Sequence, residues 1–454
     1  MNKRFAEQRA IVIGAGIGGL AAAAALANHF GQVVVLERDE LPADARPRPG
    51  AAQTRHLHVL LSGGAAALAE LFPGFLTQLV AVGAQRADVG ADAHFELAGA
   101  PKLPRRELNI YTWQLSRPLL EAVLREQLRK RENVQLRELS RVIGIVADEN
   151  NRAAGVRFES REGKHDELNS TLVIDASGRG VPTLDFLKAT GRPTPAETAV
   201  SADLTYGTTV YSFPAGAEPD FKQAWVHGEA PEHGRAGFLV KRENGLWDAV
   251  LAGRLGDVPP TEDNAYLAFA DSLPSEAIGT ALRRGRREAP IVRFGYAQSR
   301  WRHFADVAGF PAGLLPLGDA VCSTNPVFGQ GMTVAATEAV ILHRLLAKAE
   351  GNSDSLESIG PAYLKEMEEL VKAPWSGTTA LDLAYPQTKG ERPADMQQRS
   401  EYQVGVMKLA AVDPDVHRLM VEVRHLVKPA HLLHAPNLQQ RVRALLQHPA
   451  APSS

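Results

Sequence analysis

The stretch IVIGAGIGGL, residues 11–20, determines the fold of this 454-residue chain. Its first three residues are β-branched and predict a strand buried on both faces, and the alanine-rich run that follows predicts a tightly packed helix. Between them, Gly14, Gly16 and Gly19 have the Gly-x-Gly-x-x-Gly spacing. The first glycine permits a tight turn, the second lets the backbone approach a pyrophosphate, and the third lets the helix lie close to the strand. The stretch predicts a dinucleotide site at a helix N-terminus.

An acidic residue ends the next apolar strand, which is predicted over residues 33–36. Glu37 follows the third glycine by roughly 20 residues, where a carboxylate suits a ribose diol and repels a 2′-phosphate. We take Glu37 and the adjacent Arg38 as candidate cofactor contacts. This first motif does not choose between NAD and FAD.

A second stretch, LLPLGDAVCSTNPVFGQGM at residues 314–332, makes that choice. Asp319 ends an apolar strand, and a carboxylate there can accept hydrogen bonds from a polyol chain. Gly329, Gln330 and Gly331 open an apolar helix, where backbone N–H groups can stabilise negative charge. Both features fit a reduced flavin, whose ring carries an anion. We therefore expect FAD as the cofactor.

With these two motifs and a central DASGR stretch at residues 175–179, the chain resembles the FAD-dependent aromatic hydroxylase superfamily over most of its length. Within that superfamily it looks most like the FAD epoxidases and hydroxylases of polyketide tailoring, including the polyether epoxidases. The closer match is carried by RPRPGAAQTRHLHVLL (46–61), SRPLLEAVLREQL (116–128), VIDASGRG (173–180) and YGTTVYSFP (206–214). The first of these departs from the family in the Ala-Ala pair before Gln53.

The resemblance implies further cofactor contacts. Arg48 and Gln53 lie in a Pro- and Gly-rich loop that should run along the cofactor. Arg117 opens an amphipathic helix, where its guanidinium can meet phosphate or ribityl oxygens or, alternatively, lie free on the surface. Asp175 would lie near the pyrophosphate, and a plain turn after a buried strand is the alternative. Val142, in a strand predicted at 141–146, completes the set.

The predicted fold is α/β, with a Rossmann-type (glutathione-reductase-like) FAD-binding domain, a β-sheet substrate domain and a C-terminal helical region. The substrate sheet should form a wall over the flavin, but the sequence does not say which side of each strand faces inward, because a one-residue shift exchanges the faces. Its strands are predicted near 204–213, 223–227, 237–241 and 247–255, and the last helices at 361–371, 400–411, 413–427 and 437–446. The expected domains are 1–80, 105–190 and 290–350 for FAD, 81–104 and 191–289 for substrate, and 351–454 for the helical region.

Composition and charge favour a cytoplasmic enzyme with small-molecule ligands. The hydrophobic content of 44% is ordinary, and the net charge of −2 gives no electrostatic case for nucleic acid as a partner. No stretch reaches the length of a membrane span, so no integral membrane association is expected. The N-terminus imitates a secretion signal, but cleavage would remove the glycine turn. The single cysteine, Cys322, rules out an internal disulfide, and we expect it to be a buried filler.

The predicted activity is a FAD-dependent monooxygenase that acts with O2 on a largely apolar natural-product-type molecule. Reduced flavin forms a peroxide at carbon 4a, and this flavin hydroperoxide transfers oxygen to an alkene (epoxidation) or a phenol (hydroxylation). Epoxidation strictly needs no catalytic base, and for phenols the candidates are His56, His58 and Tyr211. No third ligand accompanies the His-x-His pair, so no metal site is expected, and packing or lining of the pocket is its alternative role.

The electrons should come from NAD(P)H, either directly or through a separate flavin reductase. A second Gly-x-Gly-x-x-Gly motif is absent from the sequence, which excludes a disulfide-reductase-type NAD(P)H domain. Three other functions remain open. A prenyl reductase would work without oxygen, and a regulator would bind flavin without catalysis. A halogenase would need a Trp-x-Trp-x-x-Pro segment and an active-site lysine, and Trp301 supplies only one tryptophan.

Overall fold

The centre of the molecule is a five-stranded parallel sheet in the order β18-β11-β1-β2-β7. The computed structural model describes residues 5–351 and 356–447. The strands are short apolar runs because both faces of the sheet are covered. Their bounds are β1 (Phe5–Ile13), β2 (Phe30–Leu36), β7 (Val134–Arg137), β11 (Leu172–Asp175) and β18 (Leu314–Pro316). β18 comes from late in the chain, so the sheet is assembled from distant segments, as the sequence predicted.

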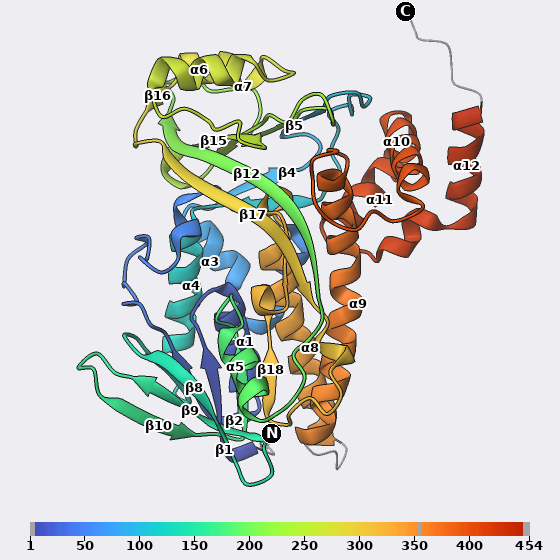
Figure 1. The fold of residues 1–454 in the computed structure, drawn as a ribbon. Coiled ribbons are helices and arrows are strands. Elements are labelled where there is room, and N and C mark those ends of the chain that lie inside the picture. Colours follow the sequence, from blue (N-terminus) through green and yellow to red (C-terminus); the bar gives the residue numbers. More distant parts are fainter. Residues whose placement is uncertain (1–4, 352–355, 448–454) are drawn as a thin grey trace, which may run out of the picture.

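Helices cover one face of this sheet and a small antiparallel sheet covers the other (Figure 1). The alanine-rich helix α1 (Ile17–Ala27) is buried along its length, which lets it lie between the sheet and α8 (Gly331–Gly351). On the opposite face lie β8 (Arg141–Ala147), β9 (Ala153–Glu159) and β10 (His165–Asn169), beside α5 (Val181–Ala189). The helical side also contains α2 (Ser62–Leu71), α3 (Phe75–Ala81) and α4 (Arg117–Arg129).

A second, eight-stranded sheet has the order β19-β17-β12-β15-β14-β13-β5, with β16 paired to β12. Its bounds are β5 (Ala93–Leu97), β12 (Glu197–Ser212), β13 (Gln223–His227), β14 (Ala236–Lys241), β15 (Trp247–Arg254), β16 (Arg286–Arg287), β17 (Val292–Arg302) and β19 (Cys322–Ser323). The expected FAD-binding segment 290–350 includes β17. This strand pairs with β12 in the eight-stranded sheet and does not join the parallel sheet. Its alternating burial is typical of an antiparallel strand. The three-part domain division otherwise stays a proposal.

β12 is a long strand that runs beside β17 (Figure 1), and its side chains belong to three hydrophobic clusters. Near its start, Val200 belongs to the main core with α1 and α8, whereas Leu204 and Tyr206 belong to the core of the eight-stranded sheet. Between them the register against β17 shifts by a bulge at Ser201–Leu204, where Asp203 has a φ of 44°. One strand therefore connects the two sheets.

The two faces of the eight-stranded sheet are now distinguished. Its outer face packs under α6 (Asp263–Asp271) and α7 (Ala277–Arg284). Its inner face is the opposite one, and it packs against Leu57, just before β3 (Val59–Leu60), and Val327, in the turn before α8. The side chains of the inner face are Leu204, Tyr206, Trp225, Phe238, Val250, Ala252, Phe294 and Tyr296. The alternation along each strand fixes the register that the sequence left open.

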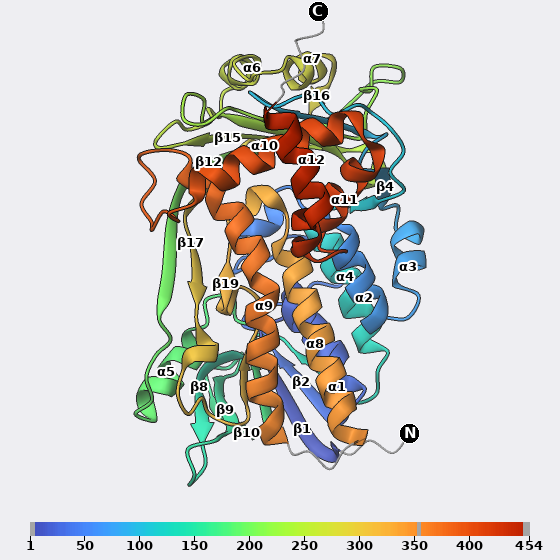
Figure 2. The same ribbon diagram turned by 90° about the vertical axis from the view of Figure 1, so that its right-hand side faces the viewer.

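The C-terminal helices lie beside this assembly (Figure 2). α9 (Leu356–Leu383) is much longer than the predicted 361–371, because its apolar side continues to pack on the core through Trp375 and Leu383. The other three are α10 (Met396–Val412), α11 (Pro414–Arg424) and α12 (Pro436–Gln447). α11 ends before the predicted residue 427, where Leu426 takes a φ of 56°.

A three-stranded sheet of β3 (Val59–Leu60), β6 (Tyr111–Gln114) and β4 (Gln85–Asp88) completes the fold. In the described part of the chain, no single helix has the length and apolar character to cross a membrane. The bent pair 62–71 and 75–81 passes that test only when taken together.

Candidate functional site

The three glycines of the first motif have three different environments. Gly14 has a φ of 98°, and a Cβ there would lie 2.7 Å from the carbonyl oxygen of Ala176. A Cβ on Gly19 would lie 1.9 Å from the carbonyl oxygen of Gly14, which no side chain can occupy. A Cβ on Gly16 would meet only Nη2 of Arg117, at 3.9 Å. The turn is thus closed at its first and third glycines and open at its second, where a pyrophosphate would approach.

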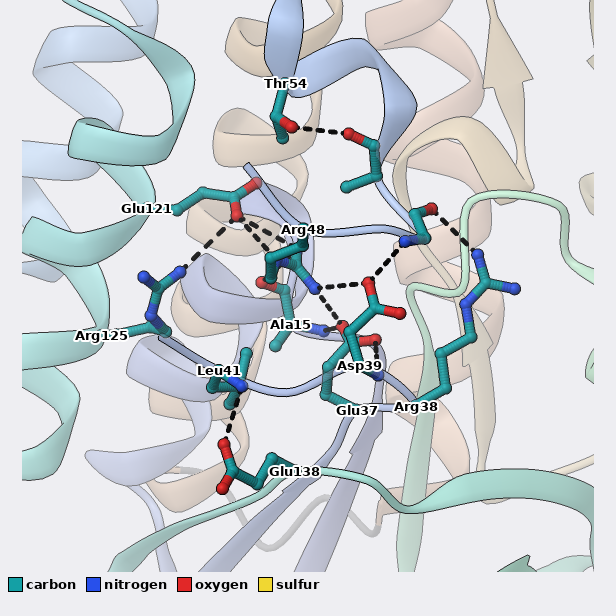
Figure 3. Close-up of polar contacts among 12 residues, drawn as sticks. Ala15, Glu37, Arg38, Asp39, Leu41, Arg48, Thr54, Glu121, Arg125 and Glu138 are labelled. Carbon is teal, nitrogen blue, oxygen red and sulfur yellow. Dashed lines mark hydrogen bonds and ion pairs between the residues drawn. The ribbon is translucent and has the colours of Figure 1, made fainter. Parts of the chain in front are cut away.

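Glu37 joins the end of β2 to this turn (Figure 3). Its Oε2 accepts hydrogen bonds from the backbone N–H of Ala15 (2.8 Å) and from Nη1 of Arg48 (2.9 Å), and its Oε1 accepts from the N–H of Asp39 (3.1 Å). A carboxylate oxygen has two acceptor lone pairs, so Oε1 retains one for a ribose hydroxyl. The exposed Arg38 donates to the carbonyl oxygen of Gly50 (2.9 Å) and holds the loop that follows.

A buried carboxylate that the sequence analysis missed organises three arginines. Oε2 of Glu121 lies 3.0 Å from Nη2 of Arg48 and 3.6 Å from Nη1 of Arg125, and its Oε1 accepts from Nε of Arg117 at 2.9 Å. Burial opposes the charge of Arg48, but Glu121 and Glu37 outweigh it and raise the pKa of that guanidinium. Arg117 uses its Nε for Glu121, so its outer edge faces the open glycine, Gly16. A buried glutamate on an amphipathic helix, four residues after an arginine, was the available signal.

Two carboxyl groups lie at the late acidic turn, Asp319 in the turn itself and Glu338 on α8. The side chain of Asp319 is exposed, yet the surrounding protein raises its pKa, against the opposing effect of Arg117 and Arg300. Beneath Asp319, Glu338 is fully buried and accepts from the N–H of Gly318 at 2.5 Å. Burial raises the pKa of Glu338 to about 8, so it is a neutral acid at pH 7.

The start of α8 is open. Gly329 has a φ of 65°, and a Cβ on Gly329 or Gly331 would meet nothing within 4 Å. The side chain of Gln330 is turned away from this space, since its Nε2 donates to the carbonyl oxygen of Arg424 at 2.9 Å. Backbone N–H groups are thus the groups that this turn offers to a ligand.

Three other predicted contacts have structural roles or peripheral positions. Both carboxylate oxygens of Asp175 accept hydrogen bonds, one from the N–H of Ser177 and the other from the N–H and hydroxyl of Thr183. This side chain therefore stabilises the turn whose backbone lies close to Gly14. Val142 is half-buried in β8, which starts beside the end of β2. Gln53 lies exposed in a 3-10 turn, Ala52–Arg55.

The two candidate histidines are linked to each other, and His56 contacts the inner side of the eight-stranded sheet. Nδ1 of His56 lies 2.7 Å from the hydroxyl of Thr208, and its ring lies 5.1 Å from that of Phe294. Nδ1 of His58 donates to the carbonyl oxygen of His56 at 2.9 Å, which leaves its Nε2 unprotonated. Burial, with Arg55, lowers the pKa of His56 to about 4, and burial, with Arg117, lowers that of His58 to about 3.

Tyr211, the third catalytic candidate, is separated from this pair. It is buried in the outer-face cluster with Trp247 and Tyr266. The alternation of β12 places it on the opposite side of the sheet from Thr208. This position was not predictable from the sequence, which leaves the register of that strand undetermined.

A group of side chains that could hold a metal ion lies away from the two candidate histidines. Among the described residues, His303, Asp306 and Glu368 form a group whose potential ligand atoms lie within 4.8 Å of one another, a cluster that was not predicted. It does not include the His-x-His pair. Cys322 is buried in the main core, and burial raises the pKa of its thiol, as a filler residue would show.

Comparisons with known proteins agree with this geometry. A sequence model described as FAD dependent oxidoreductase matches residues 10–193. Protein Rv3254 of Mycobacterium tuberculosis is 33% identical over 358 residues, which cover 75% of this chain and 73% of that protein. Among solved structures, p-nitrophenol 4-monooxygenase PnpA from Pseudomonas putida is 18% identical with a TM-score of 0.64, over 91% of this chain and 97% of that one. The myxobacterial chondrochloren halogenase CndH is 18% identical with a TM-score of 0.62, over 92% and 96%. At such identities the two structures establish a shared fold.

Proposed function

The chain belongs to the FAD-dependent aromatic hydroxylase superfamily, and on that basis we propose that it is a FAD-dependent monooxygenase for a largely apolar small molecule. The main support is the inner face of the eight-stranded sheet, an aromatic surface that packs against the segment just before Gly329. A fold shared with a halogenase does not choose the reaction. The aromatic wall beside the cofactor turn suits an apolar substrate.

The residues present fit FAD at both ends of the site. The open Gly16 and the outer edge of Arg117 would hold the pyrophosphate, and Asp319 would accept hydrogen bonds from ribityl hydroxyls. Backbone N–H groups at Gly331 would stabilise negative charge on the ring. When bound and reduced, the flavin supplies the activation of O2.

The protein side of the reaction is positioning and exclusion of water. Tyr206, Phe238 and Phe294 would orient an apolar substrate and keep the site dry. For an alkene these residues suffice. For a phenol, the unprotonated Nε2 of His58 can accept a hydrogen bond from the hydroxyl and orient it, although a pKa of about 3 makes this imidazole a weak base. His56 positions this imidazole through its backbone carbonyl. Epoxidation and hydroxylation of a natural-product-type molecule are both part of the proposal.

Electron supply belongs to the same proposal. NAD(P)H would reduce the flavin directly or through a separate flavin reductase, in a cytoplasmic setting. NADPH added alone to the anaerobic yellow protein distinguishes the two routes. Bleaching of the flavin absorbance excludes the need for a reductase, and bleaching that requires an added reductase supports one.

Oxygen uptake tests the proposed function. We expect the purified protein to bind FAD and to consume O2 in the presence of reductant and an apolar alkene or phenol, with incorporation of 18O from labelled O2 into the product. A product that incorporates bromide or chloride would indicate a halogenase, and turnover of a prenyl-type alkene without oxygen would indicate a reductase. A folded protein that binds no flavin contradicts the proposal.

A further inference from the structure

The end of α11 is held by one hydrogen bond to the cofactor turn and by two contacts with the start of α2. The carbonyl oxygen of Arg424 accepts from Nε2 of Gln330 at 2.9 Å. The next residue, His425, accepts from the N–H of Gly63 through its carbonyl oxygen (3.1 Å), and its Nδ1 lies 3.1 Å from the hydroxyl of Ser62. The backbone at Arg424 is thus attached to the N-terminal ends of both α8 and α2.

From this fixed position the side chain of Arg424 reaches the aromatic edge of the inner face. Its guanidinium carbon lies 5.2 Å from the ring centroid of Phe95 on β5. Phe95 continues into a row of rings, with His227 at 6.1 Å and Phe238 a further 5.3 Å from that histidine. Burial, with the charges of Arg424 and Arg254, lowers the pKa of His227 to about 3, so the row itself is uncharged.

Arg424 differs from its neighbours in having no acidic partner. Over residues 5–351 and 356–447, no carboxylate forms an ion pair with Arg424 and no acceptor binds its guanidinium, although burial lowers its pKa. Arg254, beside the same face, lies 2.7 Å from Asp382, and Arg418, on the same helix, lies 3.3 Å from Glu422. Arg424 is half-buried, so its guanidinium has lost part of its contact with water without gaining an acidic partner, and a nearby ring compensates only part of that loss.

We propose that Arg424 binds the carboxylate of the substrate, whose apolar body lies along Phe95, Phe238 and the rest of the inner face. This rests on the proposed function and narrows it, from an apolar molecule to an apolar acid. A guanidinium presents a planar pair of N–H donors that matches a carboxylate in a bidentate arrangement. The hydrogen bond from Gln330 fixes that anchor relative to the cofactor turn, so the acid group would set the distance of the reacting carbon from the flavin.

The experiment compares acids with their uncharged amides on the FAD-loaded protein. The probes are three pairs: cinnamic acid and cinnamamide, 2-naphthoic acid and 2-naphthamide, and linoleic acid and linoleamide. Equilibrium dialysis gives the dissociation constant of each. We expect at least one acid to bind about tenfold or more tightly than its amide to the unaltered protein. Arg424→Gln should abolish this preference and leave amide binding within about twofold, and Arg424→Lys should keep part of it.

Arg418→Gln is the matched control, because it removes an equal charge from the solvent side of the same helix. It should leave the preference for the acid unchanged. Thermal unfolding checks that each variant is folded, and the lysine variant carries the test if the glutamine variant is not.

Two outcomes would overturn the proposal. One is that no acid binds more tightly than its amide, or that Arg424→Gln keeps the preference. The other is that the variant binds acids as before but needs more NADPH to reduce its flavin, which would assign the cation to the nucleotide. Oxygen uptake with an uncharged substrate would then still support the monooxygenase, and a protein that binds no FAD would refute that function separately.

Discussion

The five-stranded sheet and the eight-stranded sheet form their parts of the site in different ways. At the first sheet, the site consists of backbone: glycines, N–H groups and a helix start, with Glu37 and Glu121 holding the turn from behind. At the second sheet, it consists of side chains that alternate along the strands, such as Tyr206 and Phe238. A backbone site fails when one atom is added, whereas a side-chain wall adapts to substitution. Four tests, two of them with a matched variant, can break or sharpen this contrast.

The largest effect is expected at the glycine turn. Gly19→Ala places a Cβ 1.9 Å from a backbone oxygen, so we expect a loss of about 3 kcal/mol or more of folding free energy and no retained FAD. Gly16→Ala is the matched variant, since its Cβ meets only the end of a flexible arginine. It should remain folded but bind FAD at least tenfold more weakly. Thermal unfolding measures the stability of each variant, and FAD titration measures its affinity for the cofactor. Equal stability of the two variants would show that Gly19 is no more crowded than Gly16.

The next effect is expected behind the turn. Glu121→Gln leaves Arg48, Arg117 and Arg125 without their shared carboxylate, and breaking a buried charge network costs roughly 3–5 kcal/mol. Chemical denaturation should show this loss, with weaker FAD binding because the arginine beside the open glycine is released. Glu126→Gln, on the same helix but exposed, should change little. A mild effect at Glu121 would mean that Glu37 alone holds the network.

A third prediction concerns pH and the buried acid beneath Asp319. The pKa of Glu338 is about 8 in the folded protein and near 4.5 when unfolded. Its contribution is therefore fully present below pH 4.5 and is lost as the pH rises through 8. Relative to Glu338→Gln, the unaltered protein should lose on the order of 3 kcal/mol between pH 5 and 8. Parallel stability curves for the two proteins over that range would contradict the neutral acid.

The smallest effect is expected on the inner face. Trp225→Phe keeps an aromatic ring on a half-buried strand position, so the free energy of unfolding should fall by less than about 1.5 kcal/mol. FAD binding should stay within about twofold, while the KM for the substrate changes. If this variant lost FAD as fully as the alanine at Gly19, the contrast between the two sheets would be wrong.

The same contrast explains what the sequence could reveal. The parallel sheet and its glycine turn were predictable, because their residue types follow from local backbone demands over a few positions. The partnership of Arg48 with Glu121 was not, since the two are far apart in the chain and meet only after folding. Glu338 was hidden within an apolar helix. The inner face could be read only once β12 was paired, and that pairing also removed Tyr211 from the candidate site.

β12 contributes side chains to the main core and to both faces of the eight-stranded sheet, and this constrains how a substrate can enter. Its sixteen residues span about 50 Å without a linker, hydrogen-bonded to β17 on one side and β15 on the other. Separating the five-stranded sheet from the eight-stranded sheet would require breaking the hydrogen bonds of β12. Small loops at the edge of the site can move at little cost. A substrate would therefore enter past mobile loops at the edge of the site, while the two sheets keep their relative positions.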